Sequence, residues 1–273
     1  MFIPRHTIAV LIASLAVVAV GCNRAPERLT PEAASAKGDA LLREMSKNLS
    51  AIQTFAFTSD EVSTGGTKGD RRISRRITIR RPNAFTFTVT GDERDGAGWY
   101  DGKQVTVVGN RAKVWARGPM PPTLDEALDF VSAEYAMQLP GGDLLYSSPY
   151  DALMTADTKG GWVDVQKIGD LMCDHLSYKQ PNVDWEIWLG PARHLPCQLK
   201  ITYKNEPGQP TTTVTFRDGD MSPQVSDETF TAKVPDGYQR IKILRHATVE
   251  DTSVEGAPSA PSDNEVGTTG KPR

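Results

Sequence analysis

The sequence has few cysteines, few aromatic residues, no surplus of charge of one sign and no long apolar run. Outside the extreme N-terminus, no apolar stretch approaches the roughly 20 residues that a membrane-spanning helix needs, which excludes a protein with several such helices. The 31 basic and 34 acidic side chains give a formal net charge of -3, which argues against a nucleic-acid-binding protein that relies on an overall positive field. Glycine (23) and proline (19) are plentiful, and this composition favours turns and strands over long helices.

The sequence also lacks the common catalytic and cofactor-binding motifs. It contains no G-x-S-x-G, no H-E-x-x-H, no C-x-x-C, no P-loop and no G-x-G-x-x-G. Asp174 and His175 are neighbours on a predicted strand, so their side chains point to opposite faces and cannot form a dyad. We therefore expect no catalytic residues, no metal site and no cofactor, and we predict that the protein is not an enzyme.

Residues 1–21 predict an export signal. Arg5 and His6 precede an apolar run that is too short to cross a bilayer, and the run ends in Ala19-Val20-Gly21-Cys22. Small residues followed at once by cysteine resemble a bacterial lipobox, so we predict that Cys22 is lipidated. Two or three acyl chains, at ~0.8 kcal/mol per buried CH2, would anchor the protein to the membrane. The alternative is an ordinary secretory signal with a chance cysteine.

The segments around the folded region predict where the protein lies. Residues 22–29 read as a lipidated linker, and Asn23, rather than aspartate, after the cysteine favours the outer membrane of a Gram-negative host, facing the periplasm. Residues 247–273 contain no leucine, isoleucine or aromatic residue, which predicts a disordered tail. We expect a protein of the bacterial cell envelope that contacts the membrane through its anchor and binds no nucleic acid. Its oligomeric state stays open.

Residues 30–246 predict one folded domain. Thr30-Pro31-Glu32 is a helix start, and Leu42, Met45, Leu49 and Ile52 form one apolar stripe of a helix that runs to about Ser50. Apolar residues then recur with period two, interrupted by two helical segments near residues 124–131 and 148–154. Because most strands are joined locally, we predict an α+β fold with one strongly curved antiparallel sheet of about ten strands and a few helices on one face. The last strand is expected at residues 230–234.

Two predicted strands carry opposite kinds of side chain. On the first, the arginine-rich segment at residues 71–81, one face carries Arg72, Ser74, Arg76, Thr78 and Arg80, and the isoleucines lie on the other. We interpret the basic face as solvated, with anionic lipid headgroups or an acidic partner as the alternative. On the second strand, Val183, Trp185, Ile187 and Leu189 share one face. They are either ordinary core or, with Phe55, Phe57, Phe85 and Phe87, the lining of an apolar cavity inside the curved sheet.

Cys173 and Cys197 could form a disulfide in an exported chain. They lie at the starts of two predicted strands that flank a third, roughly 9.5 Å apart at two inter-strand spacings. A disulfide needs Cα atoms within about 7 Å, so it forms only if the middle strand stops short. The sequence leaves both outcomes open.

Several segments together resemble the bacterial family of predicted periplasmic proteins with domain of unknown function 2092. They include Trp99-Tyr100-Asp101-Gly102-Lys103, Pro122 to Leu128, Asp143 to Tyr146, Cys173 to Leu176 and Val183 to Trp188, in an order and spacing that fit from about Glu32 to Ile243. That family is similar in fold to the LolA/LolB lipoprotein carriers, which implies an unclosed β-barrel with helices at its mouth and acyl chains bound in the concavity. The resemblance implies no reaction, and Cys197 and the lipobox depart from the family pattern.

The sequence therefore supports two functions. The first is a non-enzymatic envelope lipoprotein with an apolar cavity that binds a lipid, an acyl chain or a lipoprotein. The second is a regulatory or structural module that uses the same fold to bind a protein. A lipid-binding protein needs an open apolar hollow, whereas a docking module would have that space filled by tryptophan and phenylalanine.

Overall fold

The computed structural model of the 273-residue chain describes residues 29–67, 69–92, 94–135 and 139–243. The predicted signal, Cys22, most of the linker, the predicted tail and residues 244–246 lie outside the described residues. No helix in these described ranges is long and apolar enough to cross a membrane.

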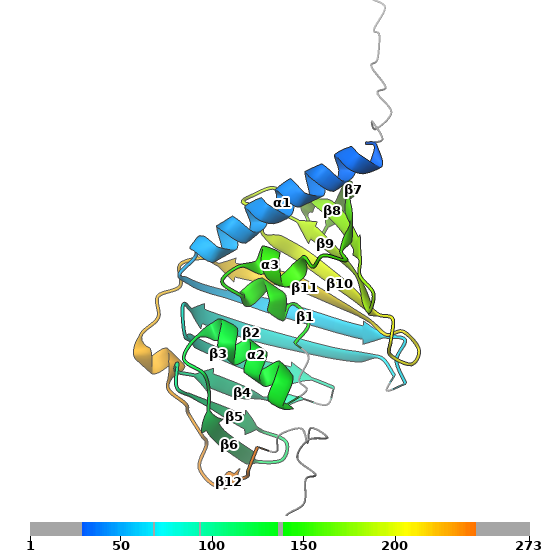
Figure 1. Ribbon diagram of the computed structural model, residues 1–273. Coiled ribbons are helices and arrows are strands. Elements are labelled where there is room, and N and C mark those ends of the chain that lie inside the picture. Colours follow the sequence, from blue (N-terminus) through cyan, green and yellow to red (C-terminus); the bar gives the residue numbers. More distant parts are fainter. Residues whose placement is uncertain (1–28, 68, 93, 136–138, 244–273) are drawn as a thin grey trace, which may run out of the picture.

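One sheet forms the body of the molecule, and it contains all twelve strands described (Figure 1). Its strand order is β12-β6-β5-β4-β3-β2-β1-β11-β10-β9-β8-β7. The strands are β1 (Thr54–Thr64), β2 (Arg71–Arg80), β3 (Ala84–Gly91), β4 (Asp95–Tyr100), β5 (Gln104–Gly109), β6 (Val114–Pro119), β7 (Lys159–Ile168), β8 (Leu171–Lys179), β9 (Val183–Leu189), β10 (Pro196–Tyr203), β11 (Thr211–Asp220) and β12 (Gln239–Arg240).

The predicted α+β fold with one curved, unclosed sheet is confirmed. Neighbouring strands are antiparallel except for β12, a two-residue strand that pairs in parallel with β6. The expected strand at residues 230–234 is wrong. In its place the segment Asp227–Phe230 forms the short 3-10 helix η2, capped by Ser226, and Phe230 is buried with the Arg80 guanidinium 4.7 Å from its ring centre.

Three α-helices and the short helix η1 cover one face of the sheet, which we call the concave face (Figure 1). Thr30 caps the first helix as predicted, since its hydroxyl accepts a hydrogen bond from the Ala33 amide at 3.2 Å. Thr123 does the same for the second, where it accepts from the Glu126 amide at 3.3 Å. The helices are α1 (Pro31–Ala51), α2 (Leu124–Tyr135), η1 (Gly142–Leu145) and α3 (Pro149–Leu153).

Helix α1 packs directly on the sheet at β7 because glycines remove side chains from the contact. A Cβ at Gly38 would lie 2.7 Å from the Gly161 Cα, and a Cβ at Gly161 would clash with the Ala34 carbonyl. Leu42 and Met45, both fully buried, then enter a core with apolar residues of β8 to β11. This end of the concave face is solidly filled.

The arginine-rich strand β2 has the alternation that the sequence predicts. Ile77 and Ile79 face the concave side, while Arg72 and Arg76 are exposed on the other. Arg76 donates to the Asp218 carbonyl at 3.4 Å, and Arg80 pairs with Asp227 at 2.8 Å. The outer face is thus partly paired with polar groups of the same chain.

Candidate functional site

A cavity of about 710 Å3 lies between α2, the η1–α3 segment and the concave face of the sheet. Its size falls within the roughly 300–1,000 Å3 that small-molecule sites occupy. The apolar lining from the sheet comprises Ile77 and Ile79 (β2), Phe85, Phe87 and Val89 (β3), Val105 and Val107 (β5), Val183 and Trp185 (β9), and Leu199 and Ile201 (β10). The lining from α2 comprises Leu124, Ala127, Leu128, Val131, Ser132 and Tyr135.

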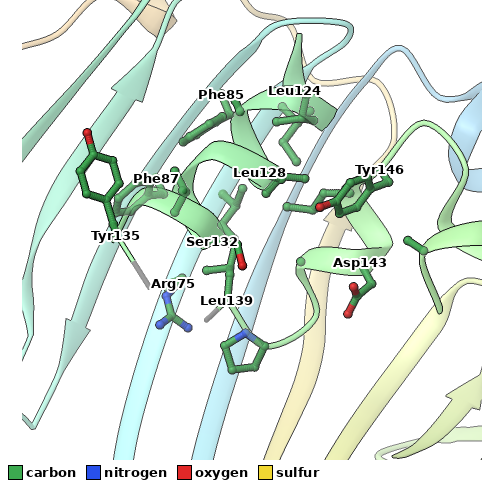
Figure 2. A pocket seen from close by; sticks show the side chains of 18 of the residues that line it. Arg75, Phe85, Phe87, Leu124, Leu128, Ser132, Tyr135, Leu139, Asp143 and Tyr146 are labelled. Atoms are coloured by element: carbon green, nitrogen blue, oxygen red, sulfur yellow. The ribbon is translucent and has the colours of Figure 1, made fainter. Parts of the chain in front are cut away.

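Helix α2 forms the roof of this cavity and presents its apolar side to it. Figure 2 shows Leu124 and Leu128 above the strands that carry Phe85 and Phe87. Three hydrogen bonds tie α2 to the segment after η1: two from Ser147 to the Asp125 carboxylate and one from the Tyr146 hydroxyl to Asp129 at 2.7 Å. The roof is therefore held both by Leu124 and Ala127, which are buried against the sheet, and by polar contacts at its outer surface, and the cavity remains beneath it.

A glycine in β4 helps to keep the floor open. Gly98 lies opposite Phe87 in the register of β3 and β4, and a Cβ there would clash with the Phe87 ring. The ring therefore lies over the glycine instead of standing out into the hollow. Tyr100, the last residue of β4, is by contrast fully buried. Its ring packs beside that of Phe85, with the ring centres 5.3 Å apart.

The structure brings four of the eight predicted lining residues to the cavity. Phe85 and Phe87 reach it from β3, and Val183 and Trp185 from β9, strands that lie far apart in the sheet order. The two groups thus form opposite walls of one hollow, as the curvature of the sheet requires.

The other four predicted residues do not line the cavity, and the expectation is corrected for them. Ile187 and Leu189 are fully buried in the core beneath α1. Phe55 is buried with Ile52 and Ile79, and Phe57 packs against that cluster with its ring centre 5.8 Å from Phe216. They lie on the predicted face, but α1 and its neighbours cover that part of the sheet.

Arg75 is a lining residue that the sequence reasoning missed. It shares the concave face of β2 with Ile77 and Ile79, is 8% exposed and pairs with Glu61 of β1, itself 7% exposed. The alternation of β2 could have identified it, because Arg75 has the same parity as the isoleucines. A buried ion pair is costly to desolvate, so its presence in an apolar wall calls for a reason beyond packing.

Asp143 and Tyr203 are two further polar groups of the lining. Burial raises the pKa of the Asp143 carboxyl, which favours its protonated form. Burial also raises the pKa of Tyr203 to about 12, with smaller contributions from Glu206, Glu61 and Asp143. Neither side chain receives a hydrogen bond from another described residue, so both are available to a bound molecule.

The sequence also matches a known protein family over most of its length. The family described as "Predicted periplasmic protein (DUF2092)" matches residues 38–244, well over half of the chain. The chain belongs to this family. This match confirms the resemblance inferred from the sequence. The description of the family gives a periplasmic location. No curated protein matches the chain.

Solved structures show a more distant likeness. An uncharacterized conserved protein from Thermus thermophilus has a TM-score of 0.46 at 10% identity, over 75% of this chain and 98% of its own. The lipoprotein LppX from Mycobacterium tuberculosis has 0.41 at 12%, over 69% and 97%. A LolA superfamily protein from Nitrosomonas europaea has 0.37 at 11%, over 72% and 98%. These likenesses are too distant to assign a ligand or a partner to this member of the family.

The two cysteines meet at the end of β9. Strand β9 ends at Leu189, which pairs with Asp174, so Cys173 lies beyond its end, while Cys197 lies at a register shift of β10 between Pro196 and Gln198, next to that end. Their sulfurs lie 2.7 Å apart, both thiols are free and both residues are buried. The condition that the sequence set for a disulfide, a middle strand that stops short, is met. The disulfide itself stays a prediction.

His175 lies on the outer face of the sheet, away from the cavity. As expected it does not face Asp174. Its Nδ1 lies 3.1 Å from Asp164 and its Nε2 2.8 Å from Glu186, while its ring stacks on Trp188 at 4.5 Å. Lys200 pairs with Glu186 at 2.9 Å, so the histidine belongs to a structural hydrogen-bond network on this face. No group of three or more histidine, cysteine or carboxylate side chains suited to a metal ion occurs in the described ranges.

Proposed function

We propose that the protein is a non-enzymatic lipoprotein of the cell envelope, tethered through Cys22, whose cavity binds an acyl chain. The observation that carries the proposal is the hollow of about 710 Å3 beneath α2, lined mainly by aliphatic and phenylalanine side chains. An apolar chain that leaves water for such a wall gains about 25 cal/mol per Å2 of buried surface. A module that only docks proteins would not need this space, which favours lipid binding over the second candidate.

Mass spectrometry of co-purified molecules tests the binding directly. All helices and strands of the structure lie between Pro31 and Arg240, so a chain that starts at residue 22 and carries Cys22→Ser keeps the whole fold. Purified from cells under detergent-free conditions, it should carry acyl lipids. It should also bind N-phenyl-1-naphthylamine, an uncharged apolar dye. If no lipid is carried and the dye does not bind, lipid binding is refuted.

A matched pair of variants locates the binding in the cavity. Val107 lines the cavity, and Gln104 of the same strand is exposed. Val107→Trp should fill part of the hollow and weaken dye binding at least about tenfold, which corresponds to 1.4 kcal/mol. Gln104→Trp adds the same side chain at the surface and should leave the affinity unchanged. Equal effects of the two variants would show that the dye binds elsewhere.

The anchor is tested separately. In cells fed with labelled palmitate, the Cys22→Ala variant should lose the label, and Cys173→Ser should keep it. The wild type should fractionate with the outer membrane, and Asn23→Asp should shift it toward the inner membrane. A palmitate label that persists without Cys22 would contradict the lipobox interpretation.

A further inference from the structure

A row of polar side chains crosses the concave floor. Ser59 lies opposite Arg75 in the register of β1 and β2, and Ser63 lies opposite Thr212 in that of β1 and β11, with Glu61 between the two serines. Ser59, Glu61, Arg75 and Thr212 are each no more than 8% exposed. Polar groups in an apolar concavity cost free energy unless they find partners. The concave side of β1, which begins with Phe55 and Phe57, is thus polar from Ser59 onward, although Phe216 and Val214 of β11 lie opposite Ser59 and Glu61.

The members of this row are only partly satisfied by one another. Arg75 pairs with Glu61, and the Ser63 and Thr212 hydroxyls lie 2.9 Å apart. Asp143 from η1 and Tyr203 from β10 line the same cavity. Figure 2 shows the side chains of Arg75 and Asp143 extending toward the same side of the hollow. Among the described residues, the Tyr203 hydroxyl has no hydrogen-bond partner and the Asp143 carboxyl accepts only from its own backbone amide, so both can bond to a ligand.

The charges at this level disfavour an anionic ligand group. The Arg75 guanidinium is already matched by Glu61, and Asp143 adds a carboxyl with no cation of its own. Arg94, the other arginine of the lining, is exposed and so acts through water. A phosphate would meet two carboxyls and only one buried, already paired guanidinium. An uncharged group with hydroxyl and ester oxygens would instead accept from the Tyr203 hydroxyl and donate its own hydroxyl to the Asp143 carboxyl.

We propose that Asp143, Tyr203 and the buried pair Arg75–Glu61 form a subsite for the uncharged, hydrogen-bonding head of an acyl lipid, such as the glycerol ester of a monoacylglycerol. The acyl chain would then lie along Phe85, Phe87 and Val107 beneath α2. This inference rests on the proposed function and adds the chemistry of the head group to it.

Displacement of bound N-phenyl-1-naphthylamine by lipids of one chain length tests the subsite. The Cys22→Ser chain from residue 22 is titrated with 1-monopalmitoylglycerol, palmitoyl lysophosphatidic acid and hexadecylamine. Monopalmitoylglycerol should displace the dye at the lowest concentration. Tyr203→Phe and Asp143→Leu should each weaken this lipid about three- to tenfold, the effect of one net hydrogen bond, once the displacement is corrected for each variant's own dye affinity.

Tyr238→Phe is the matched control. Tyr238 lies outside the cavity lining and its hydroxyl donates to Asn110 at 3.2 Å, so its loss should not alter the preference among the three lipids. If the dye binds but the phosphate or amine lipid binds more tightly, or if neither Asp143→Leu nor Tyr203→Phe weakens monopalmitoylglycerol, the head-group subsite is refuted and the lipid cavity stands. If the dye itself does not bind the wild type, the proposed function fails as well.

Discussion

The two halves of the concave face are covered by helices in different ways. Under α1, glycines let the helix backbone reach the sheet, and Leu42 and Met45 fill the remaining space completely. Under α2, the helix is held by hydrogen bonds at its outer surface, and a cavity of about 710 Å3 remains beneath it. Figure 1 shows α1 and α2 over different parts of one sheet, and the packing beneath them makes the first half solid and the second hollow.

This difference separates stability from binding. Close packing at native density stabilises a fold but leaves no room for a ligand. Side chains that line an empty cavity lose van der Waals contacts on that side, so the rest of the core must supply the stability of the fold. The largest of the four apolar clusters among the described residues lies beneath α1, which explains why the α2 half can remain open.

The largest effect is expected where α1 meets β7. Gly161→Ala places a Cβ against the Ala34 carbonyl and should separate the helix from the sheet, at a cost of about 3 kcal/mol. Gly118→Ala in β6 is the control, because its Cβ would meet only Ile243 at 3.6 Å. Urea denaturation of both variants measures the difference. Equal free energies of unfolding for the two variants would mean that the close approach of α1 to β7 does not contribute to stability.

Truncation of one leucine in each half comes next. Leu42→Ala in the solid half should destabilise by about 3 kcal/mol, since it removes a fully buried side chain and leaves a void. Leu128→Ala in the roof of the hollow should cost about 1 kcal/mol, because its side chain is only partly buried and already borders open space. Leu128→Ala should nevertheless weaken dye binding, and Leu42→Ala should not. Equal free energies of unfolding for the two variants would contradict the proposed difference in packing between the two halves.

The solid half was the easier one to predict from sequence. The cap at Thr30 and the stripe of Leu42, Met45 and Leu49 locate α1 to within a residue or two, because capping and period are local properties. Strands with clear alternation, such as β2 and β9, were equally evident. The strand predicted at residues 230–234 was wrong because Phe230 and the alternating residues after it have the period of a strand. In the structure Phe230 is instead the last residue of the short helix η2.

The hollow half was predicted only in part. Phe85 and Val183 were found because they alternate on predicted strands, and Arg75 could have been found in the same way. Asp143 could not, since it lies in a short helical turn whose place over the floor depends on tertiary packing. Whether a concave face is filled or open depends on the height of α2 above the sheet, which no local pattern encodes.

A disulfide at the edge of the solid half should contribute a stability of similar size. In the exported protein we expect the Cys173 and Cys197 thiols to lose two protons and two electrons to a disulfide-donating oxidant of the envelope. The product would link β8 to β10 past the end of β9. The intact mass should then be lower by two hydrogens, and reduction should cost about 2–4 kcal/mol of stability. Two alkylatable thiols in the denatured, unreduced protein would contradict this.

The smallest effect concerns pH and the hollow half. Burial raises the pKa of Asp143 in the folded state above its ordinary value of about 3.9 in the unfolded chain. The folded state therefore disfavours the ionised carboxyl, and the stability present below about pH 4 declines as the pH rises through the folded pKa. Asp143→Asn cannot ionise, so its advantage in Tm over the wild type should grow from pH 4 to pH 8. Asp170→Asn, on the exposed turn after β7, should show no such growth, and a constant difference for Asp143→Asn would mean that its carboxyl stays well solvated.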